Sequence, residues 1–143
     1  YSVLGDAVNL AARLEGQTKG YGVKTIIGEE TAKEIDDVFA TLEIDNIAVK
    51  GKTEGVRIFT VLGEHSWWNE NSAYVFETKQ HTKMLDLYRM QKFDMAIKFC
   101  NDLKGCFLGT MDDYYEVWIA RCEEMKTQNL PKDWDGVYRP TTK

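Results

Sequence analysis

Apolar and polar positions in residues 1–63 recur with two different periods, which predict different elements. Tyr1–Leu4 is an apolar run typical of a short strand that Gly5 ends, and the apolar positions after Asp6 recur at helical spacing. That helix is expected to end within residues 16–22, where glycines gather. Further strands are predicted at residues 23–28, 39–45, 47–51 and 56–63, and a helix with an acidic first turn at residues 29–36. This order predicts an α+β unit with helices packed on a sheet.

The pattern changes at residues 64–72, EHSWWNENS, which we interpret as a polar, turn-prone linker. Beyond it, large apolar residues recur at helical spacing. The C-terminal stretch NLPKDWDGVYRPTTK holds both prolines and predicts an extended tail, pinned by Trp134, Val137 and Tyr138. The chain is therefore divided into residues 1–63, a linker at 64–72, and a helical extension with an extended tail at 73–143.

The stretch LYRMQKFDMAIKFCNDL resembles a tetratricopeptide helix pair. The resemblance is carried by Tyr88, Phe93, Ala96 and Phe99, and the small Ala96 would let two helices approach closely. A full array needs about three repeats, and roughly one and a half are present, which predicts a small all-α, tetratricopeptide-like unit. The alternative is that these aromatic side chains simply fill a core, the commonest place for large apolar residues.

Charge and composition exclude several classes of partner. The formal net charge is −5 and no basic cluster occurs, so we expect no nucleic-acid binding. Three cysteines without a CxxC pair and two histidines make a disulfide framework or a structural zinc site unfavourable. Without a long apolar run, we expect no membrane contact by this segment and a cytoplasmic location. The chain starts inside a predicted strand without a methionine, so we expect it to be part of a longer protein.

Several familiar motifs are absent or incomplete. The GKT at residues 51–53 is not a phosphate-binding loop of the Walker type, because that pattern requires glycine where Asn46 stands. No HExxH, no Ser-His-Asp order and no dinucleotide fingerprint occurs. His65 and His81 are expected to be solvated or to cap helices. The acidic pairs Asp112–Asp113 and Glu123–Glu124 are expected to be solvated helix charges.

Two polar residues of the first predicted helix stand out. Asn9 and Arg13 lie four positions apart, so both side chains point from the same helix face. Taken alone, the pair has an ordinary interpretation as a solvated amide beside an ion-paired guanidinium. Lys50, at a predicted strand end before Gly51, could present an ammonium group to phosphate oxygens.

The surrounding sequence favours a functional interpretation. YSVLGDAVNLAARLEG is similar to the strand-turn-helix signature of class III nucleotidyl cyclases, the adenylate and guanylate cyclase family. The matching positions are Tyr1, Gly5, Asp6, Val8, Asn9, Ala11, Ala12 and Arg13. Downstream, VKGKTEGVRIFTV resembles the family's Val-Lys-Gly-Lys strand pair. The helical part and the ending DWDGVYRPTTK resemble the C-terminal extension of bacterial cyclases that carry a CHASE-type sensor, so the likeness covers essentially the whole chain.

The resemblance implies a fold, a reaction and residue roles. Residues 1–63 would be the C-terminal part of a ferredoxin-like cyclase sandwich. The reaction would be the attack of the ribose 3′-oxygen of ATP on its own α-phosphorus, giving cyclic AMP and pyrophosphate for intracellular signalling. Arg13 would stabilise charge on the α-phosphate, Asn9 would orient the ribose, and Lys50 would hold the β- and γ-phosphates. Ser2 would read the purine edge, where a hydroxyl favours adenine over guanine.

The resemblance also implies components that this sequence does not supply. The family binds two Mg²⁺ or Mn²⁺ ions through two aspartates upstream of the signature, so no metal ligand is expected among these residues. Its active site forms across a dimer, which predicts a homodimer or higher oligomer, and the full-length protein would carry an upstream sensor domain. The isolated chain is therefore expected to be inactive. The alternative is a non-catalytic, cyclase-derived module for interaction or dimerisation.

Overall fold

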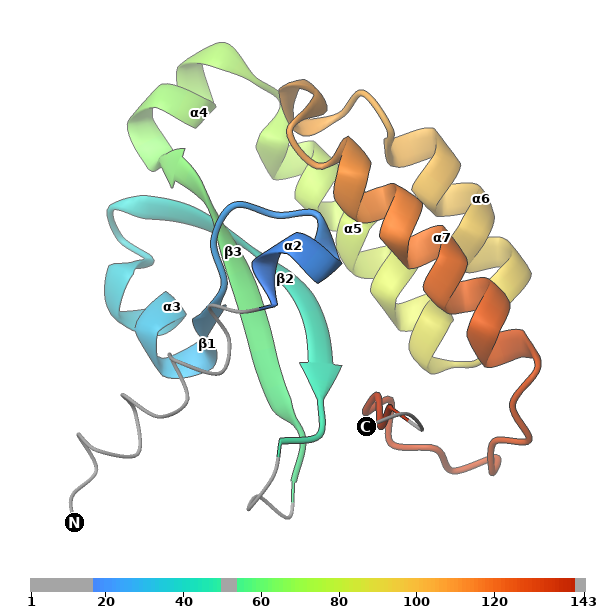
Figure 1. Ribbon diagram of the computed structural model, residues 1–143. Coiled ribbons are helices and arrows are strands. Elements are labelled where there is room, and N and C mark those ends of the chain that lie inside the picture. Colours follow the sequence, from blue (N-terminus) through green and yellow to red (C-terminus); the bar gives the residue numbers. More distant parts are fainter. Residues whose placement is uncertain (1–16, 50–53, 141–143) are drawn as a thin grey trace, which may run out of the picture. The chain divides into compact units, whose positions relative to one another are not determined.

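The computed structural model describes residues 17–49 and 54–140 (Figure 1). These residues fall into two compact units. The sheet unit comprises the described residues up to Ser66 together with residues 137–140, and the helical unit comprises Trp67–Gly136. The sheet unit is thus discontinuous in sequence, with the helical unit between its two parts.

The sheet unit is built on three antiparallel strands, β1 (Ile27–Gly28), β2 (Phe39–Ile47) and β3 (Val56–Glu64). Their spatial order is β1-β3-β2, so β3 is the central strand. Buried side chains alternate along β2 until a bulge near Ile44, beyond which Asp45 is buried as well. A bulge places two residues opposite one, which turns consecutive side chains away from strict alternation.

Three of the predicted strands differ from the observed ones. The strands predicted at 39–45 and 47–51 form the single strand β2 within the described residues, because Asn46 continues the pairing with β3. The strand predicted at 23–28 is reduced to Ile27–Gly28. Before it, the hydroxyl of Thr25 accepts the amide hydrogen of Val61, a bond from a side chain in place of a strand ladder.

Two short helices belong to the same unit. Helix α2 (Thr18–Tyr21) ends at Gly22, whose φ of 70° is the left-handed conformation in which glycine commonly ends a helix. Helix α3 (Glu29–Ile35) confirms the helix predicted from its acidic first turn, which holds Glu29 and Glu30. The observed architecture confirms the α+β prediction, whereas the ferredoxin-like sandwich stays a prediction.

The predicted linker contains a helix. Residues His65–Asn71 form α4, although EHSWWNENS was expected to be turn-prone. Trp68 is buried, and its ring meets the ring of Tyr74 edge to face with a centroid distance of 6.1 Å. Packing of a large aromatic side chain outweighs the weak helix propensity of the surrounding polar residues.

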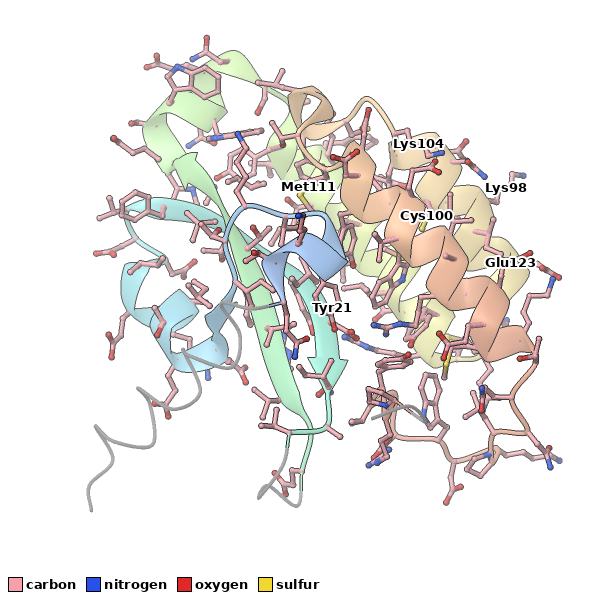
Figure 2. The ribbon with its side chains drawn as sticks, in the orientation of Figure 1. Tyr21, Lys98, Cys100, Lys104, Met111 and Glu123 are labelled. Atoms are coloured by element: carbon pink, nitrogen blue, oxygen red, sulfur yellow. The ribbon has the colours of Figure 1, made fainter. Side chains whose placement is uncertain are left out.

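The helical unit continues with α5 (Tyr74–Arg89), α6 (Phe93–Leu103), a 3₁₀ turn (Phe107–Gly109) and α7 (Asp112–Lys126). Helix α6 packs against both α5 and α7. The largest fully buried side chains of this core are aromatic: Tyr88, Phe107, Tyr114, Tyr115 and Trp118. Cys100 and Met111 are also buried, whereas Lys98 and Glu123 are exposed at the surface (Figure 2).

Part of the predicted tetratricopeptide signature lies in this core. Ala96 is completely buried on α6, the helix between α5 and α7, where a small side chain permits close approach. Phe99 is only partly buried and lies under the ammonium group of Lys83, 5.6 Å from the ring centroid. The core interpretation of the buried aromatic residues is confirmed, and the tetratricopeptide-like interpretation stays a prediction.

Candidate functional site

The four residues predicted to contact substrate are Ser2, Asn9, Arg13 and Lys50, and all four lie outside the described residues. The structure does describe the residues that flank residues 50–53 in the chain. The pair Ile47↔Val56 is the last one between β2 and β3 before that connection. Lys50 therefore belongs to the chain segment that joins these two antiparallel strands.

A buried carboxylate lies close to this strand end. Asp45 is 1% exposed, and its Oδ2 atom accepts a hydrogen bond of 2.6 Å from the phenolic hydroxyl of Tyr21 on α2. Its Oδ1 atom accepts a hydrogen bond of 2.7 Å from the amide of Asn46. A buried carboxylate needs such donors, because desolvation of the charge is otherwise costly. Asp45 thus joins α2 to the end of β2.

The sequence carries only an indirect signal for the burial of Asp45. In FATLEIDNI, small or apolar residues at Ala40, Leu42 and Ile44 alternate with polar residues as far as Asp45, and this period breaks only at Asn46–Ile47. An acidic residue within a half-buried strand lies either on the solvent face or at a bulge, where its carboxylate has a buried partner. The choice between them depended on Tyr21, 24 residues earlier, which no local pattern identifies.

Residues 137–140 add backbone pairing to β2, which is an edge strand of the sheet among the described residues. Tyr138 forms an isolated parallel bridge with Ile47. The Tyr138 amide donates to the Asn46 carbonyl at 2.8 Å, and the Ala48 amide donates to the Tyr138 carbonyl at 3.0 Å. Val137 is 5% exposed. The prediction that Val137 and Tyr138 pin the tail is confirmed, and their contacts are with the sheet unit.

The guanidinium of Arg57 forms ion pairs with two carboxylates, those of Glu29 and Glu43. Arg57 on β3 donates to Glu43 at 3.0 and 3.1 Å and to Glu29 at 2.6 Å. The hydrogen bond to Glu43 is the main cause that raises the pKa of Arg57, against the opposing effect of desolvation. Because two carboxylates already neutralise this guanidinium, it is a structural group and a poor phosphate ligand.

The two histidines have different environments. The Nε2 atom of His65 lies 2.6 Å from the carbonyl oxygen of Asp36, the residue that follows α3, so the ring donates there and the capping prediction is confirmed. His81 was expected to be solvated or to cap a helix, which is wrong. It is 1% exposed, and its Nδ1 atom lies 2.7 Å from the hydroxyl of Tyr115. The ring belongs to the aromatic core of the helical unit, where Phe107 also meets it edge-on.

The acidic pairs follow the prediction with one exception. Asp113, Glu123 and Glu124 are exposed, as solvated helix charges should be. Asp112 instead accepts a hydrogen bond of 2.8 Å from the amide of Gly105. Gly105 has a φ of +90°, so this carboxylate holds a turn that precedes α7.

No metal or membrane feature is found within residues 17–49 and 54–140. Over these ranges, no group of three or more His, Cys, Asp or Glu side chains could hold a metal ion. The carboxylate of Asp45 is engaged by Tyr21 and Asn46. The described residues therefore do not fit the two-ion site that the cyclase resemblance implies. Over the same residues, no helix combines the length and apolar character that crossing a bilayer requires.

The known proteins that this chain resembles in sequence, described below, are all named adenylate cyclase. No protein-family model and no solved structure matches the chain. "Adenylate cyclase, terminal-differentiation specific" from Dictyostelium discoideum is 30% identical over 137 residues, which cover 90% of this chain and 6% of that protein. "Adenylate cyclase" from Anabaena cylindrica is 41% identical over 63 residues, 42% of this chain and 12% of that protein.

A third relative agrees with the first two. "Adenylate cyclase 1" from Rhizobium meliloti (strain 1021) is 30% identical over 63 residues, which cover 44% of this chain and 10% of that protein. The chain thus spans between 6% and 12% of the length of these three relatives. Its sequence is related to adenylate cyclases and corresponds to a small part of each.

Proposed function

We propose that this chain is part of an adenylate cyclase of class III, which converts ATP into cyclic AMP and pyrophosphate for intracellular signalling. The similarity to proteins named adenylate cyclase carries this proposal, above all the match that extends over 90% of the chain. The signature residues Asn9 and Arg13 and the Val-Lys-Gly-Lys motif support it from within the sequence. The α+β character of the sheet unit is compatible with it.

In this proposal the residues of this chain hold the substrate by charge and shape. Arg13 stabilises negative charge that develops on the α-phosphate, for which a permanently ionised, forked donor is well suited. Asn9 orients the ribose so that its 3′-oxygen lies in line with the α-phosphorus. Lys50 holds the β- and γ-phosphates, and Ser2 contacts the purine edge. Positioning and charge stabilisation account for most of the catalysis in phosphoryl transfer.

The remaining components would come from outside the described residues. Two Mg²⁺ or Mn²⁺ ions would lower the pKa of the 3′-hydroxyl and stabilise the leaving pyrophosphate. Because the described residues do not fit such a site, we assign no step of the reaction to a metal held by them. A homodimer or higher oligomer, an upstream sensor and a tetratricopeptide-like role for the helical unit belong to the same proposal.

The test is a pair of arginine variants in a longer protein that joins this chain to a segment with the two metal-binding aspartates. Arg13→Ala should lower the rate of cyclic AMP formation by roughly 10²-fold, as expected for loss of a transition-state donor. The matched control is Arg57→Ala, which removes a guanidinium held by Glu29 and Glu43. It should leave the rate within about twofold, since exposed ion pairs contribute little.

Equal turnover in the two variants would remove Arg13 from the reaction. A longer protein without any cyclase activity would favour the alternative, a non-catalytic module for interaction or dimerisation.

A further inference from the structure

We propose that protonation of His81 at mildly acid pH opens the turn Gly105–Gly109, which we call the strained turn. All of the residues involved belong to the helical unit. The switch is independent of the proposed function, because neither the nucleotide nor any residue assigned to it takes part. It gives a pH-dependent role to a part of the chain for which the cyclase signature assigns none.

The strained turn has an unusual backbone. The angle φ is positive at Gly105 and Gly109, where glycine tolerates it, and also at Phe107 and Leu108, where it is 54° and 55°. Residues with a side chain rarely adopt this conformation, because their Cβ atom then crowds the backbone. Such a conformation persists only where the surrounding structure holds it, so the strained turn should rearrange once its contacts are lost.

A buried ring and two carboxylates hold the strained turn in place. The side chain of Phe107 is completely buried, and its ring meets the ring of His81 edge to face with a centroid distance of 6.3 Å. The carboxylate of Glu77 on α5 accepts a hydrogen bond of 2.9 Å from the amide of Phe107. The carboxylate of Asp112 on α7 accepts one of 2.8 Å from the amide of Gly105. The turn therefore depends on two carboxylates staying where they are.

The histidine beside this turn is buried as a neutral ring. His81 is 1% exposed, and its Nδ1 atom lies 2.7 Å from the hydroxyl of Tyr115. Burial raises the pKa of Tyr115, so the phenol keeps its proton and can donate a hydrogen bond to Nδ1. A proton on Nδ1 removes this acceptor. It also places a charge among aromatic rings, which include Tyr114 at 5.7 Å between centroids.

The charged groups around this pair are the carboxylates that hold the turn. After burial, the groups that raise the pKa of Tyr115 are Cys100 on α6, Cys106 in the strained turn, Glu77 and Asp112. Within this set, the two carboxylates are the groups that carry negative charge at mildly acid pH. Glu77 also lies four residues before His81 on α5, so the two side chains share a helix face. An imidazolium ring would therefore attract the carboxylates away from the amides of the turn.

The direction of the pH effect follows from linkage. Burial disfavours the charged form of an imidazole, so the closed turn binds this proton less readily than an open turn that admits water. A fall in pH therefore shifts the equilibrium towards the open turn. Histidine ordinarily changes charge between about pH 5 and pH 8, above the range of carboxylic acids at about pH 4. The open turn would present the ring of Phe107 next to Leu108, whose side chain is already 54% exposed.

Amide hydrogen exchange of the 143-residue chain, followed by NMR, measures the opening directly. The amide of Phe107 should lose about tenfold in protection between about pH 7.5 and about pH 5.5, after correction for the intrinsic pH dependence of exchange. Amides in the middle of α5 and α7, such as those of Leu85 and Cys122, should keep their protection. Their behaviour shows whether the helical unit remains folded.

The chain holds two histidines, which gives a matched pair of variants. His81→Asn removes the titrating group and keeps an oxygen that can accept from Tyr115, so the protection of the Phe107 amide should no longer depend on pH. His65→Asn is the control, because His65 contacts the carbonyl of Asp36 in the sheet unit and should leave the pH dependence intact.

A glutamine at position 77 tests the link between the histidine and the turn. Glu77→Gln can still accept the amide of Phe107 but offers no charge to an imidazolium ring, so it should reduce the pH dependence of exchange. This variant keeps the test decisive if His81→Asn does not fold. An undiminished pH dependence in Glu77→Gln would overturn the proposed link.

The backbone strain has a test of its own. Leu108→Gly removes the Cβ atom that disfavours a φ of 55°, so the Phe107 amide should gain about threefold in protection. Leu108→Ala loses most of the same exposed side chain and keeps the strain, so it should leave the protection unchanged. Equal protection in the two variants would show that the turn stores no strain.

The exchange data decide between a local switch and its alternatives. A Phe107 amide whose protection does not change with pH would overturn the proposal, as would a pH dependence that survives in His81→Asn. Equal losses at Leu85 and Cys122 would also overturn it, because acid would then unfold the whole helical unit. A loss confined to the strained turn, abolished by His81→Asn and retained in His65→Asn, supports the switch. None of these outcomes bears on cyclase activity.

Discussion

At the scale of single residues, the buried hydrogen bond between Tyr21 and Asp45 is the clearest case of a polar group that the fold must satisfy. The carboxylate is 1% exposed and receives hydrogen bonds from a phenol and a backbone amide. When one donor is removed, the buried acceptor is left unsatisfied, and its cost of desolvation is no longer offset by a hydrogen bond. The side chains thus link a short helix to the strand end that leads toward Lys50.

Tyr21→Phe should lower the free energy of unfolding by about 1–3 kcal/mol, because the ring remains and the donor is lost. Urea titration followed by far-ultraviolet circular dichroism measures the change. Asp45→Asn provides the comparison, since its side-chain oxygen can still accept from the Tyr21 hydroxyl and its charge is removed. An unchanged midpoint in Tyr21→Phe would show that this hydrogen bond does not stabilise the fold.

His81 illustrates what sequence cannot provide at this scale. A histidine among polar residues in ETKQHTKM gives no local sign of burial. Its hydrogen-bond partner Tyr115 lies 34 residues away, on α7. Burial raises the pKa of Tyr115, so the phenol keeps its proton and can donate to the imidazole. Contacts between residues so far apart in sequence depend on the tertiary arrangement, and no periodic pattern in the sequence reveals them.

At the scale of elements, periodicity predicted the helical unit well. The spacing of apolar residues identified the stretches that became α5, α6 and α7, because each helix buries one face in a shared core. Periodicity was less informative for α4 and β1. There, Trp68 and the hydroxyl of Thr25 determine the local structure through individual contacts.

Two buried thiols in α6 and α7 give this unit a predicted sensitivity to alkali. Desolvation raises the pKa of Cys122 from 9.0 to about 12, and burial raises the pKa of Cys100 as well. In the unfolded chain both thiols would ionise near 9.0. The folded unit therefore binds more protons than the unfolded chain above that pH, and its stability falls as pH rises from about 9 toward 12.

The free energy of unfolding should fall by up to about 1.4 kcal/mol per pH unit for each thiol in that range. Tryptophan fluorescence during urea titration is a suitable measurement, because all four tryptophans lie within Trp67–Gly136. Cys122→Ala should reduce the slope more than Cys106→Ala, because the partly exposed Cys106 thiol, whose pKa burial also raises, is less buried. A slope that Cys122→Ala leaves unaltered would contradict the assignment.

At the scale of the whole molecule, the sequence predicted the α+β class and the helical extension, whereas the substrate residues lie outside the described ranges. The cyclase signature is local and could be identified from residues close in sequence. The pairing of Tyr138 with Ile47 joins positions 91 residues apart, as 138 minus 47 gives. Such long-range strand pairs depend on backbone hydrogen bonds, which carry little sequence information.

The 143-residue chain alone should form no detectable cyclic AMP from ATP with either Mg²⁺ or Mn²⁺. Its described residues contain no group of acids that could hold a metal ion, and the proposed function places those ligands elsewhere. Chromatographic assay of the reaction products, with an active adenylate cyclase as the positive control, measures this. Cyclic AMP formed by the purified chain and abolished by Arg13→Ala would show that a complete site is present.

The discontinuous sheet unit has a consequence for synthesis on the ribosome. Residues 137–138 emerge only after every residue of Trp67–Gly136 has been translated. The helical unit can therefore fold while the edge of β2 still lacks its parallel partner. Until residues 137–138 emerge, that edge lacks its bridge to Tyr138, and nascent copies on neighbouring ribosomes can pair there before their own tails arrive.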